Sequence, residues 1–409
     1  MKSPEDGASE GGLVDRDLED LVRELNAESP RRTPEAPASD VRLDRLFEGR
    51  GSAEQTPLRG ALELMAERGA SDLHLLVGLP WALRIDDEMT PLDDRDALTA
   101  GELRHLLAPH LGAREEQLLE ERGAADFSLT AALPTGRERF RVNVHRQRGE
   151  LAAAIRRLPA RVPGLGALGL PESMARLIEP RQGLLLVAGP TGSGKTTTLA
   201  SLVGVLNARR RAHVITIEDP VEYEQASASC FIEHVEVGRD SPSFADALRA
   251  SLRQDPDVLV VGEMRDLETI EVALTAAETG HLILSSVHAA DGVQALRRLV
   301  DVFPGTTRSH VAHQLALSLN AVVSQRLLPR ADGRGRVVAV ETLMATPAVR
   351  RQVRDGLFEK IHNEVTLGAR YGMVSMESSL AALVRTGAIH ESDALARSTR
   401  PDELRSLLR

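Results

Sequence analysis

Residues 183–199, GLLLVAGPTGSGKTTTL, combine residue types and spacing that suit the binding of a triphosphate. The apolar run Leu184–Ala188 has the length of one buried strand, and it leads into GPTGSGKT, which matches the phosphate-loop pattern G-x-x-x-x-G-K-[ST]. Glycines let backbone N–H groups turn toward an anion, and a helix beginning at about Lys195 would present its positive end there. We expect Lys195 to contact the β- and γ-phosphates and the Thr196 hydroxyl to hold Mg²⁺. The nucleotide-binding residues predicted on this loop are Gly189, Pro190, Thr191, Gly192, Ser193, Gly194, Lys195, Thr196 and Thr197.

Two further strands are expected to bring acidic side chains close to the phosphate loop. Residues 213–222, HVITIEDPVE, put Glu218, Asp219 and Glu222 just after a strand, at the carboxyl edge where ligands bind in open α/β sheets. Alone, such a cluster would be a solvated loop. Beside a phosphate loop it predicts carboxylates that order water around Mg²⁺, with Glu218 as a ligand acting partly through water.

The second acidic strand, in DVLVVGEMRD at residues 257–266, ends in Gly262 and Glu263. Many nucleotide-site strands end in Asp, which binds Mg²⁺ through water. The longer Glu suits orienting or deprotonating the attacking water, so we predict Glu263 as the catalytic base. An ordinary surface glutamate is the alternative.

Two histidines bracket the strand in GHLILSSVHAAD, residues 280–291. His288 is predicted at the same sheet edge as Glu218 and Glu263, which favours a contact with the γ-phosphate. His281 is predicted at the opposite end of the strand, where a packing or subunit-contact role is favoured.

The elements that must position these residues follow an alternating pattern. From about Ser173, strands alternate with helices, which indicates a parallel sheet with crossover helices. The expected strands are Leu184–Ala188, His213–Ile217, Val258–Val261, Leu282–Val287 and Val337–Leu343, and the expected helices are Lys195–Asn207, Phe244–Gln254, Leu267–Glu278, Gly292–Leu299 and Ser309–Leu319. The chain from Pro347 is expected to be mostly helical.

A smaller α/β domain is predicted before this one. Its expected helices are Leu58–Arg68 and Leu103–Glu121, and its expected strands are Ser71–Leu76, Trp81–Ile85, Asp126–Leu129, Arg139–His145 and Leu151–Leu158. The predicted organisation is a disordered acidic, Pro-rich extension at 1–55, the small domain at 56–158, a hinge at 159–172, an ATPase domain at 173–345 and a helical region at 346–409.

Composition excludes several classes of protein. The 409 residues carry a formal net charge of −10 and only 2% aromatic residues, which disfavours broad binding to nucleic acids. The single cysteine, Cys230, excludes an intrachain disulfide framework and a Cys-rich zinc site. No apolar run approaches the ~18 residues of a membrane span, and the polar N-terminus is no secretory signal. We expect a cytoplasmic protein that reaches membranes through a partner, without direct insertion.

Together these motifs resemble those of the type IV pilus retraction ATPases, the PilT family of secretion and pilus motors. The likeness runs from about residue 58 to 390. Its carriers are SDLH (71–74), RFRVN (139–143), GPTGSGKT (189–196), TIEDPVE (216–222), ALRASLRQDPD (247–257), VGEMRDLET (261–269), ALTAAETGHL (273–282), VDVFP (300–304), TPAVRRQVRD (346–355) and LGARYGMVSME (367–377). Three features depart from the family pattern: the long N-terminal extension, His234 in place of Gln, and Arg351-Gln352 in the segment that resembles the retraction-associated helix.

The resemblance implies a PAS-like small domain, a RecA-like P-loop ATPase domain and a hexameric ring that uses ATP and Mg²⁺. It implies catalytic roles for Glu263, Lys195 and Glu222. It also implies an acidic box of Glu218, Asp219 and Glu222, and a histidine box of His281 and His288. Arg141 and Arg156 match arginines that approach the nucleotide from the small domain.

The resulting expectation is a motor for pilus retraction and twitching motility, working on a platform protein at the cytoplasmic face of the inner membrane. A pilus-assembly or type II secretion ATPase is one alternative, but those relatives usually carry a four-cysteine zinc module. A catalytically inert accessory ring is another, but Lys195 and Glu263 are both present. A nucleic-acid translocase is disfavoured by the acidic composition.

Overall fold

The computed structural model describes residues 57–86, 88–92 and 95–409. The predicted disordered extension lies outside the described residues. By their contacts, the described residues form two compact units. One contains residues up to 161 together with 220–224, and the other contains residues 162–219 and 225–409.

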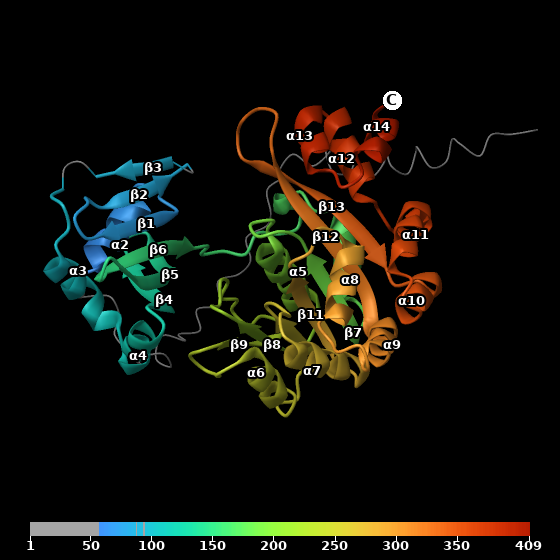
Figure 1. The fold of residues 1–409 in the computed structure, drawn as a ribbon, viewed down its shortest axis with the longest axis horizontal. Coiled ribbons are helices and arrows are strands. Elements are labelled where there is room, and N and C mark those ends of the chain that lie inside the picture. The colour runs from blue at the N-terminus through green and yellow to red at the C-terminus, as the bar shows by residue number, and fades with distance from the viewer. Residues whose placement is uncertain (1–56, 87, 93–94) are drawn as a thin grey trace, which may run out of the picture. The chain divides into compact units, whose positions relative to one another are not determined.

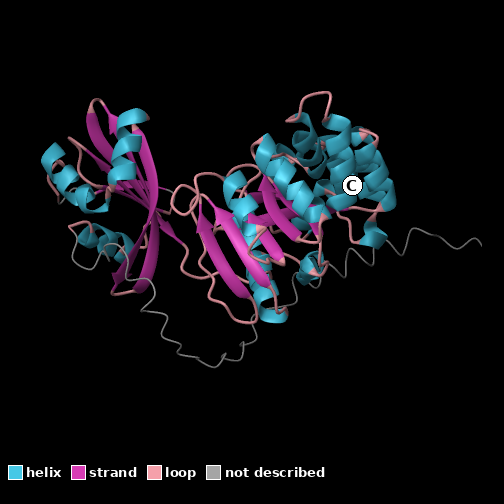
Figure 2. Ribbon diagram, turned by 90° about the horizontal axis from the view of Figure 1, so that it is seen from below, coloured by secondary structure: helices cyan, strands magenta, loops and turns pink. Residues whose placement is uncertain are grey.

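The N-terminal unit is an antiparallel sheet with helices on its apolar face (Figure 2). Its strand order is β3-β2-β1-β6-β5-β4. Buried side chains such as Leu73, Phe140 and Ile155 pack against Leu62 and Leu103 of the helices. The elements are α2 (Arg59–Glu67), β1 (Asp72–Leu76), β2 (Ala82–Ile85), β3 (Glu88–Pro91), α3 (Ala100–Leu107), α4 (Ala113–Glu121), β4 (Ala124–Leu133), β5 (Gly136–Gln147) and β6 (Glu150–Leu158).

Two details of this unit differ from the sequence-based expectation. Strand β3 was not expected, and all its residues are exposed, so it lacks the apolar alternation that marks a strand. The single helix expected at 103–121 is two helices joined by the 3₁₀ turn Ala108–His110. Pro109 lies in that turn, and it cannot donate the backbone hydrogen bond that a continuous helix requires.

The second unit is built on a seven-stranded sheet with the order β13-β12-β7-β11-β10-β8-β9 (Figure 1). Every neighbouring pair is parallel except β12 with β13. Its strands are β7 (Gly183–Ala188), β8 (His213–Glu218), β9 (Phe231–Glu236), β10 (Val258–Val261), β11 (Leu282–Val287), β12 (Leu319–Pro329) and β13 (Arg336–Met344). Its helices are α5 (Lys195–Arg209), α6 (Phe244–Ser251), α7 (Leu267–Glu278), α8 (Gly292–Asp301) and α9 (Arg308–Ser318).

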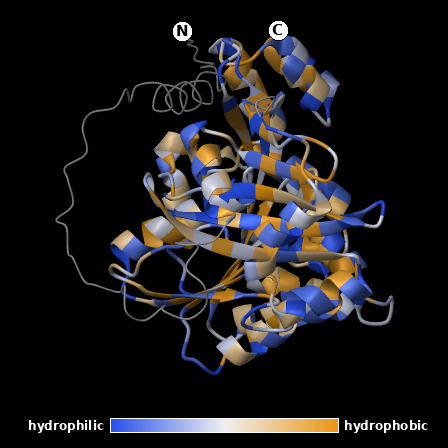
Figure 3. Ribbon diagram, turned by 90° about the vertical axis from the view of Figure 1, so that its left-hand side faces the viewer, coloured by the Kyte–Doolittle hydropathy of each residue, from blue (hydrophilic) through white to orange (hydrophobic). Residues whose placement is uncertain are grey.

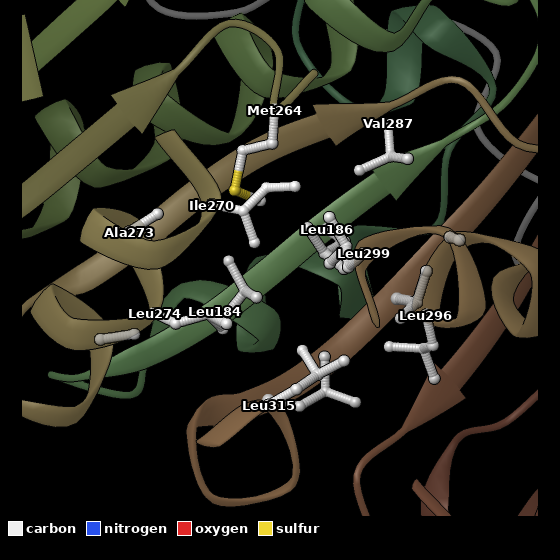
Figure 4. Packing of buried hydrophobic residues seen from close by; sticks show 14 of the residues in the cluster. Leu184, Leu186, Met264, Ile270, Ala273, Leu274, Val287, Leu296, Leu299 and Leu315 are labelled. Carbon is white, nitrogen blue, oxygen red and sulfur yellow. The ribbon is translucent and has the colours of Figure 1, made fainter. Parts of the chain in front are cut away.

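The sheet is buried on both faces, as parallel sheets require. Alternate residues of β7 show this: Leu184 and Leu186 pack in the cluster that contains α7 and α9, whereas Leu185 and Val187 pack in the cluster that contains α5. Figure 4 shows the first of these clusters. In Figure 3 the helices show bands of hydrophobic and hydrophilic residues, the pattern of elements that bury one side only.

The chain ends in five helices, as the mostly helical prediction for this region implies. They are α10 (Pro347–Arg354), α11 (Ile361–Leu367), α12 (Met376–Arg385), α13 (Glu391–Arg397) and α14 (Pro401–Leu408). Helices α12–α14 pack on the β12–β13 hairpin through a cluster that includes Leu328, Ala339, Met376 and Leu404. None of the helices in the described part of the chain is long and apolar enough to cross a membrane.

Candidate active site

The order of the parallel strands brings four loops together. Strands β7, β11, β10 and β8 are consecutive neighbours, so their carboxyl ends lie side by side along one sheet edge. Those ends lead into the phosphate loop, His288, Glu263, and Glu218 with Asp219, respectively. Because β11 lies between β7 and β10, His288 comes between the phosphate loop and Glu263.

At its three glycines, the phosphate loop adopts positions where a side chain would either clash or strain the backbone. A Cβ at position 189 would lie 2.3 Å from Ser193 Oγ and 2.6 Å from the backbone oxygen of Gln325. Gly192 and Gly194 have φ angles of +75° and +87°, a region that residues with a Cβ rarely adopt. Helix α5 begins at Lys195, as expected, so the positive N-terminal end of the helix faces the loop.

Lys195 is buried and its ammonium is directed into the loop. Its Nζ lies 3.1 Å from the Gly189 oxygen, 3.0 Å from the Pro190 oxygen and 3.3 Å from His288 Nδ1. Thr196 and Thr197 occupy the first turn of α5 beside it. An ammonium, a helix N-terminus and a glycine-shaped loop form a donor set that fits the phosphates of a nucleotide.

Glu263 is held between two basic side chains. Its Oε2 lies 2.7 Å from Arg265 and 3.3 Å from His288 Nε2, and only 14% of its side chain is exposed. The imidazole of His288 therefore contacts both Glu263 and Lys195. The backbone of this segment is also fixed, because Ser286 Oγ donates to the Gly262 oxygen over 2.6 Å.

The electrostatics of this trio keep the carboxylate ionised. Burial acts to raise the pKa of Glu263, but the hydrogen bond from Arg265 and the electrostatic interactions with His288, Arg265 and Lys195 outweigh burial and lower it. Burial and the nearby Lys195 ammonium lower the pKa of His288. At neutral pH the site thus holds an ionised glutamate and a neutral histidine, a combination able to accept a proton from water.

The acidic box is divided between the two units. Glu218 ends β8, and a Cβ at Gly262 would lie 3.5 Å from its Cα. The charge of Asp219 acts on Arg265. Glu222 belongs to segment 220–224, which groups with the N-terminal unit. Among the described residues, no three His, Cys, Asp or Glu side chains converge on a metal position. A Mg²⁺ ion held by Thr196 and Glu218 would therefore need phosphate and water oxygens as well.

The two arginines expected from the small domain are neighbours in its sheet. Arg141 on β5 is directly opposite Arg156 on β6. Arg156 Nε is 2.7 Å from Asp72, and Arg141 is 3.4 Å from Asp126. The two arginines thus lie side by side on the N-terminal unit, each paired with an aspartate, and their contact with a nucleotide stays a prediction.

His281 and His234 make structural contacts. His281 precedes β11, and its Nδ1 lies 3.1 Å from the Ala276 oxygen at the end of α7, so it is remote from His288 along the strand. His234, which departs from the family pattern, bridges Thr216 Oγ1 at 2.8 Å and the Gln225 backbone N–H at 3.1 Å. In this chain His234 therefore ties β8 to the segment that precedes β9.

Two residues of the site had no role assigned from the sequence. Arg265 is two positions beyond Glu263, and this short spacing is the sequence feature that could have indicated its role beside Glu263. Gln325 lies on β12, where its amide donates to the Ser193 oxygen over 2.5 Å and accepts from Thr198 Oγ1 over 2.9 Å. Gln325 thus holds the phosphate loop in place, although it lies 132 positions beyond Ser193 in the sequence. No local spacing marks such a contact.

Comparisons with known proteins agree with this geometry. The family profile described as type II/IV secretion system protein matches residues 57–406. The type IV pilus retraction ATPase PilT of Pseudomonas aeruginosa is 38% identical, over 83% of this chain and 98% of that protein. A crystal structure of the pilus retraction motor PilT with bound ADP has a TM-score of 0.78 and 42% identity, covering 86% of this chain and 100% of that chain.

A pilus-assembly ATPase matches over a much shorter stretch. The assembly ATPase PilB of Pseudomonas aeruginosa is 42% identical, but only over 40% of this chain and 28% of its own length. The profile and the nearly full-length match to a retraction ATPase show that this chain belongs to the type II/IV secretion system protein family, as a PilT-type ATPase.

Proposed function

We propose that this chain is an ATP-hydrolysing motor that powers type IV pilus retraction, and thereby twitching motility. The observation that carries the proposal is the contact of His288 with both Lys195 and Glu263 at the edge of the phosphate loop. This arrangement places a phosphate-binding cation and an ionised base on either side of one imidazole. Similarity to a retraction ATPase over 98% of that protein's length supports the same assignment.

In the proposed reaction the loop amides and Lys195 bind the phosphates of ATP. Glu263 orients a water molecule and accepts its proton as the water attacks the γ-phosphate. His288 contacts both Glu263 and Lys195, so a γ-phosphate bound at Lys195 can change the position of His288 and, through it, of Glu263. When Mg²⁺ is bound with the nucleotide, it neutralises phosphate charge, and Thr196 and Glu218 are the residues that would hold it.

The proposal includes a homo-hexameric ring acting on a platform protein at the cytoplasmic face of the inner membrane. Family membership supports an oligomeric ATPase. To generate force, a subunit must change conformation and push on its neighbours. We therefore propose that each subunit closes and reopens about residues 159–172. Arg141 and Arg156 would contact the nucleotide in the closed state, as the family resemblance implies.

Pilus assembly is the second candidate, and the comparison with PilB weighs against it. The two functions predict opposite phenotypes, which gives a direct experiment. A deletion strain should carry excess surface pili that do not retract, and the wild-type gene should restore the normal number. Loss of surface pili in the deletion strain would indicate an assembly motor instead.

A further inference from the structure

Strand β12 contacts two loops of the active site through consecutive buried residues. Gln325 and Arg326 point to opposite faces of the sheet, as adjacent strand residues must. Gln325 holds the phosphate loop through Ser193 and Thr198. Arg326 donates from Nη2 to the Ala290 oxygen over 3.0 Å, and Ala290 lies two residues beyond His288. Strand β12 therefore holds the two segments that carry Lys195 and His288.

The charges of three buried acidic side chains, from three elements, act on the buried guanidinium of Arg326. Asp291 precedes α8, Glu341 is on β13 and Glu377 is on α12, and all four side chains are buried. Burial lowers the pKa of Arg326, while the charges of Glu377, Asp291 and Glu341 act against this effect. A buried cation of this kind is stable only while its acidic partners are in place.

Two of the acids fix the loop that follows His288. Asp291 accepts from the Gln294 N–H over 2.8 Å, and Glu341 accepts from the Gly292 N–H over 2.9 Å. With the bond from Arg326 to Ala290, these contacts hold the backbone from 290 to 294. The position of His288 relative to Glu263 therefore depends on this acidic cluster.

The third acid belongs to the C-terminal helices. Glu377 Oε1 accepts from Ser398 Oγ over 2.9 Å and from the Arg400 N–H over 3.2 Å, so it joins α12 to the segment between α13 and α14. Its Oε2 is buried and finds no hydrogen-bond partner among the described residues. Glu377 is therefore bonded to the C-terminal helices and also acts electrostatically on Arg326 of strand β12. Figure 1 shows α12–α14 beside the β12–β13 hairpin.

We propose that Arg326 is a positioning residue through which Glu377 couples the C-terminal helices α12–α14 to the His288 loop and so sets the rate of ATP hydrolysis. Displacement of these helices would move Glu377 away from Arg326. The guanidinium would then shift toward Asp291, and the bond to Ala290 would weaken. This inference rests on the ATPase activity of the same site and adds to it a route by which the C-terminal helices control turnover.

The test compares Glu377→Gln, Arg326→Gln and the double variant in the full-length chain. Each single substitution should lower kcat on the order of tenfold with unchanged KM for ATP, because a small displacement of a catalytic side chain slows chemistry more than binding. The double variant should lose less than the product of the two single losses, because it relieves repulsion among the remaining acids. Additive losses, or a change confined to KM, would overturn the coupling.

Glu403→Gln is the matched control. It breaks the 2.9 Å pair between Glu403 on α14 and His362 on α11, which is also in the C-terminal region but outside the acidic cluster. It should leave kcat unchanged. A loss of kcat equal to that of Glu377→Gln would show that any loosening of these helices matters and would overturn the specific role of Glu377.

Amide hydrogen exchange gives a second readout that does not require turnover. Glu377→Gln should accelerate exchange at residues 289–294, and Glu403→Gln should not. Unchanged exchange there would overturn the proposal even if the wild type hydrolyses ATP. Faster exchange in a chain without ATPase activity would instead support the coupling and contradict the proposed function. If Arg326→Gln does not fold, Glu377→Gln and its control still give this result.

Discussion

At the scale of single residues, the account depends on an ionised Glu263 beside a neutral His288. Glu263→Gln removes the proton acceptor but keeps the shape and a hydrogen-bonding group. We expect turnover to fall on the order of 10²–10⁴-fold with ATP affinity retained, the usual contribution of a positioned general base. Steady-state ATPase assays and titration with a fluorescent ATP analogue would measure both quantities. Glu271→Gln, an exposed position on α7, is the control that should change neither.

Arg265 gives a prediction about pH. Its hydrogen bond and charge lower the pKa of Glu263, whereas burial acts to raise it. Arg265→Ala removes the hydrogen bond and the charge that oppose the effect of burial, so the pKa of Glu263 should rise. Because the base works only when ionised, the acid limb of the kcat/KM profile should move to higher pH. Arg239→Ala, which removes an exposed arginine near Asp240, should leave the profile in place. An unmoved acid limb in Arg265→Ala would show that Arg265 does not set the ionisation of Glu263.

At the scale of elements, helix α10 offers a surface that is separate from the chemistry. Val349 and Val353 are fully buried against the core, whereas Ala348 and Arg354 are exposed. Arg350 fixes the helix by donating to the Ala316 and Leu317 oxygens at the end of α9. Arg354 pairs with Asp355 at the end of its own helix, so its substitution should leave the packing of α10 against the core in place.

Substitution of Ala348 and Arg354 should therefore separate two activities. We expect ATPase activity in vitro to be largely intact and pilus retraction in cells to be lost. Val353→Ala is the contrasting variant, because a buried truncation should lower stability, by about 1–3 kcal/mol, and with it both activities. Parallel loss of ATPase activity and retraction in the surface variant would mean that α10 is only structural.

Most of the elements that carry the site could be predicted from the sequence. Strands β7, β8, β10 and β11 are apolar runs, and each is followed by the polar residue that the chemistry needs. Strand β12 could not be predicted, because its buried Ser324, Gln325 and Arg326 interrupt the apolar pattern. Gln325 and Arg326 bond to loops from distant parts of the sequence, which only the folded sheet brings near, and these bonds allow the two polar side chains to be buried.

At the scale of the whole molecule, the proposed motor converts ATP hydrolysis into motion between the two units. The γ-phosphate can favour a closed state only through contacts that differ between the open and closed states. Arg141 and Arg156, adjacent on β5 and β6, are the proposed source of those contacts, since guanidinium groups bind phosphate oxygens in a fixed geometry.

Distance labels on the two units of one subunit would test this closure. The distance should change when a non-hydrolysable ATP analogue is added to the wild type. In the Arg141→Ala, Arg156→Ala double variant the change should be much smaller. Equal closure in both proteins would remove the arginines from this role, and no change in the wild type would refute the hinge at 159–172.

We propose that ATP hydrolysis at Glu263 drives pilus retraction, and imaging of labelled pili on living cells would show whether it does. The deletion strain would carry the wild-type gene or the Glu263→Gln variant, expressed at equal levels. The wild-type gene should restore retraction, whereas Glu263→Gln should leave abundant pili that extend but do not retract. Retraction at the wild-type frequency and speed with Glu263→Gln would contradict this proposal.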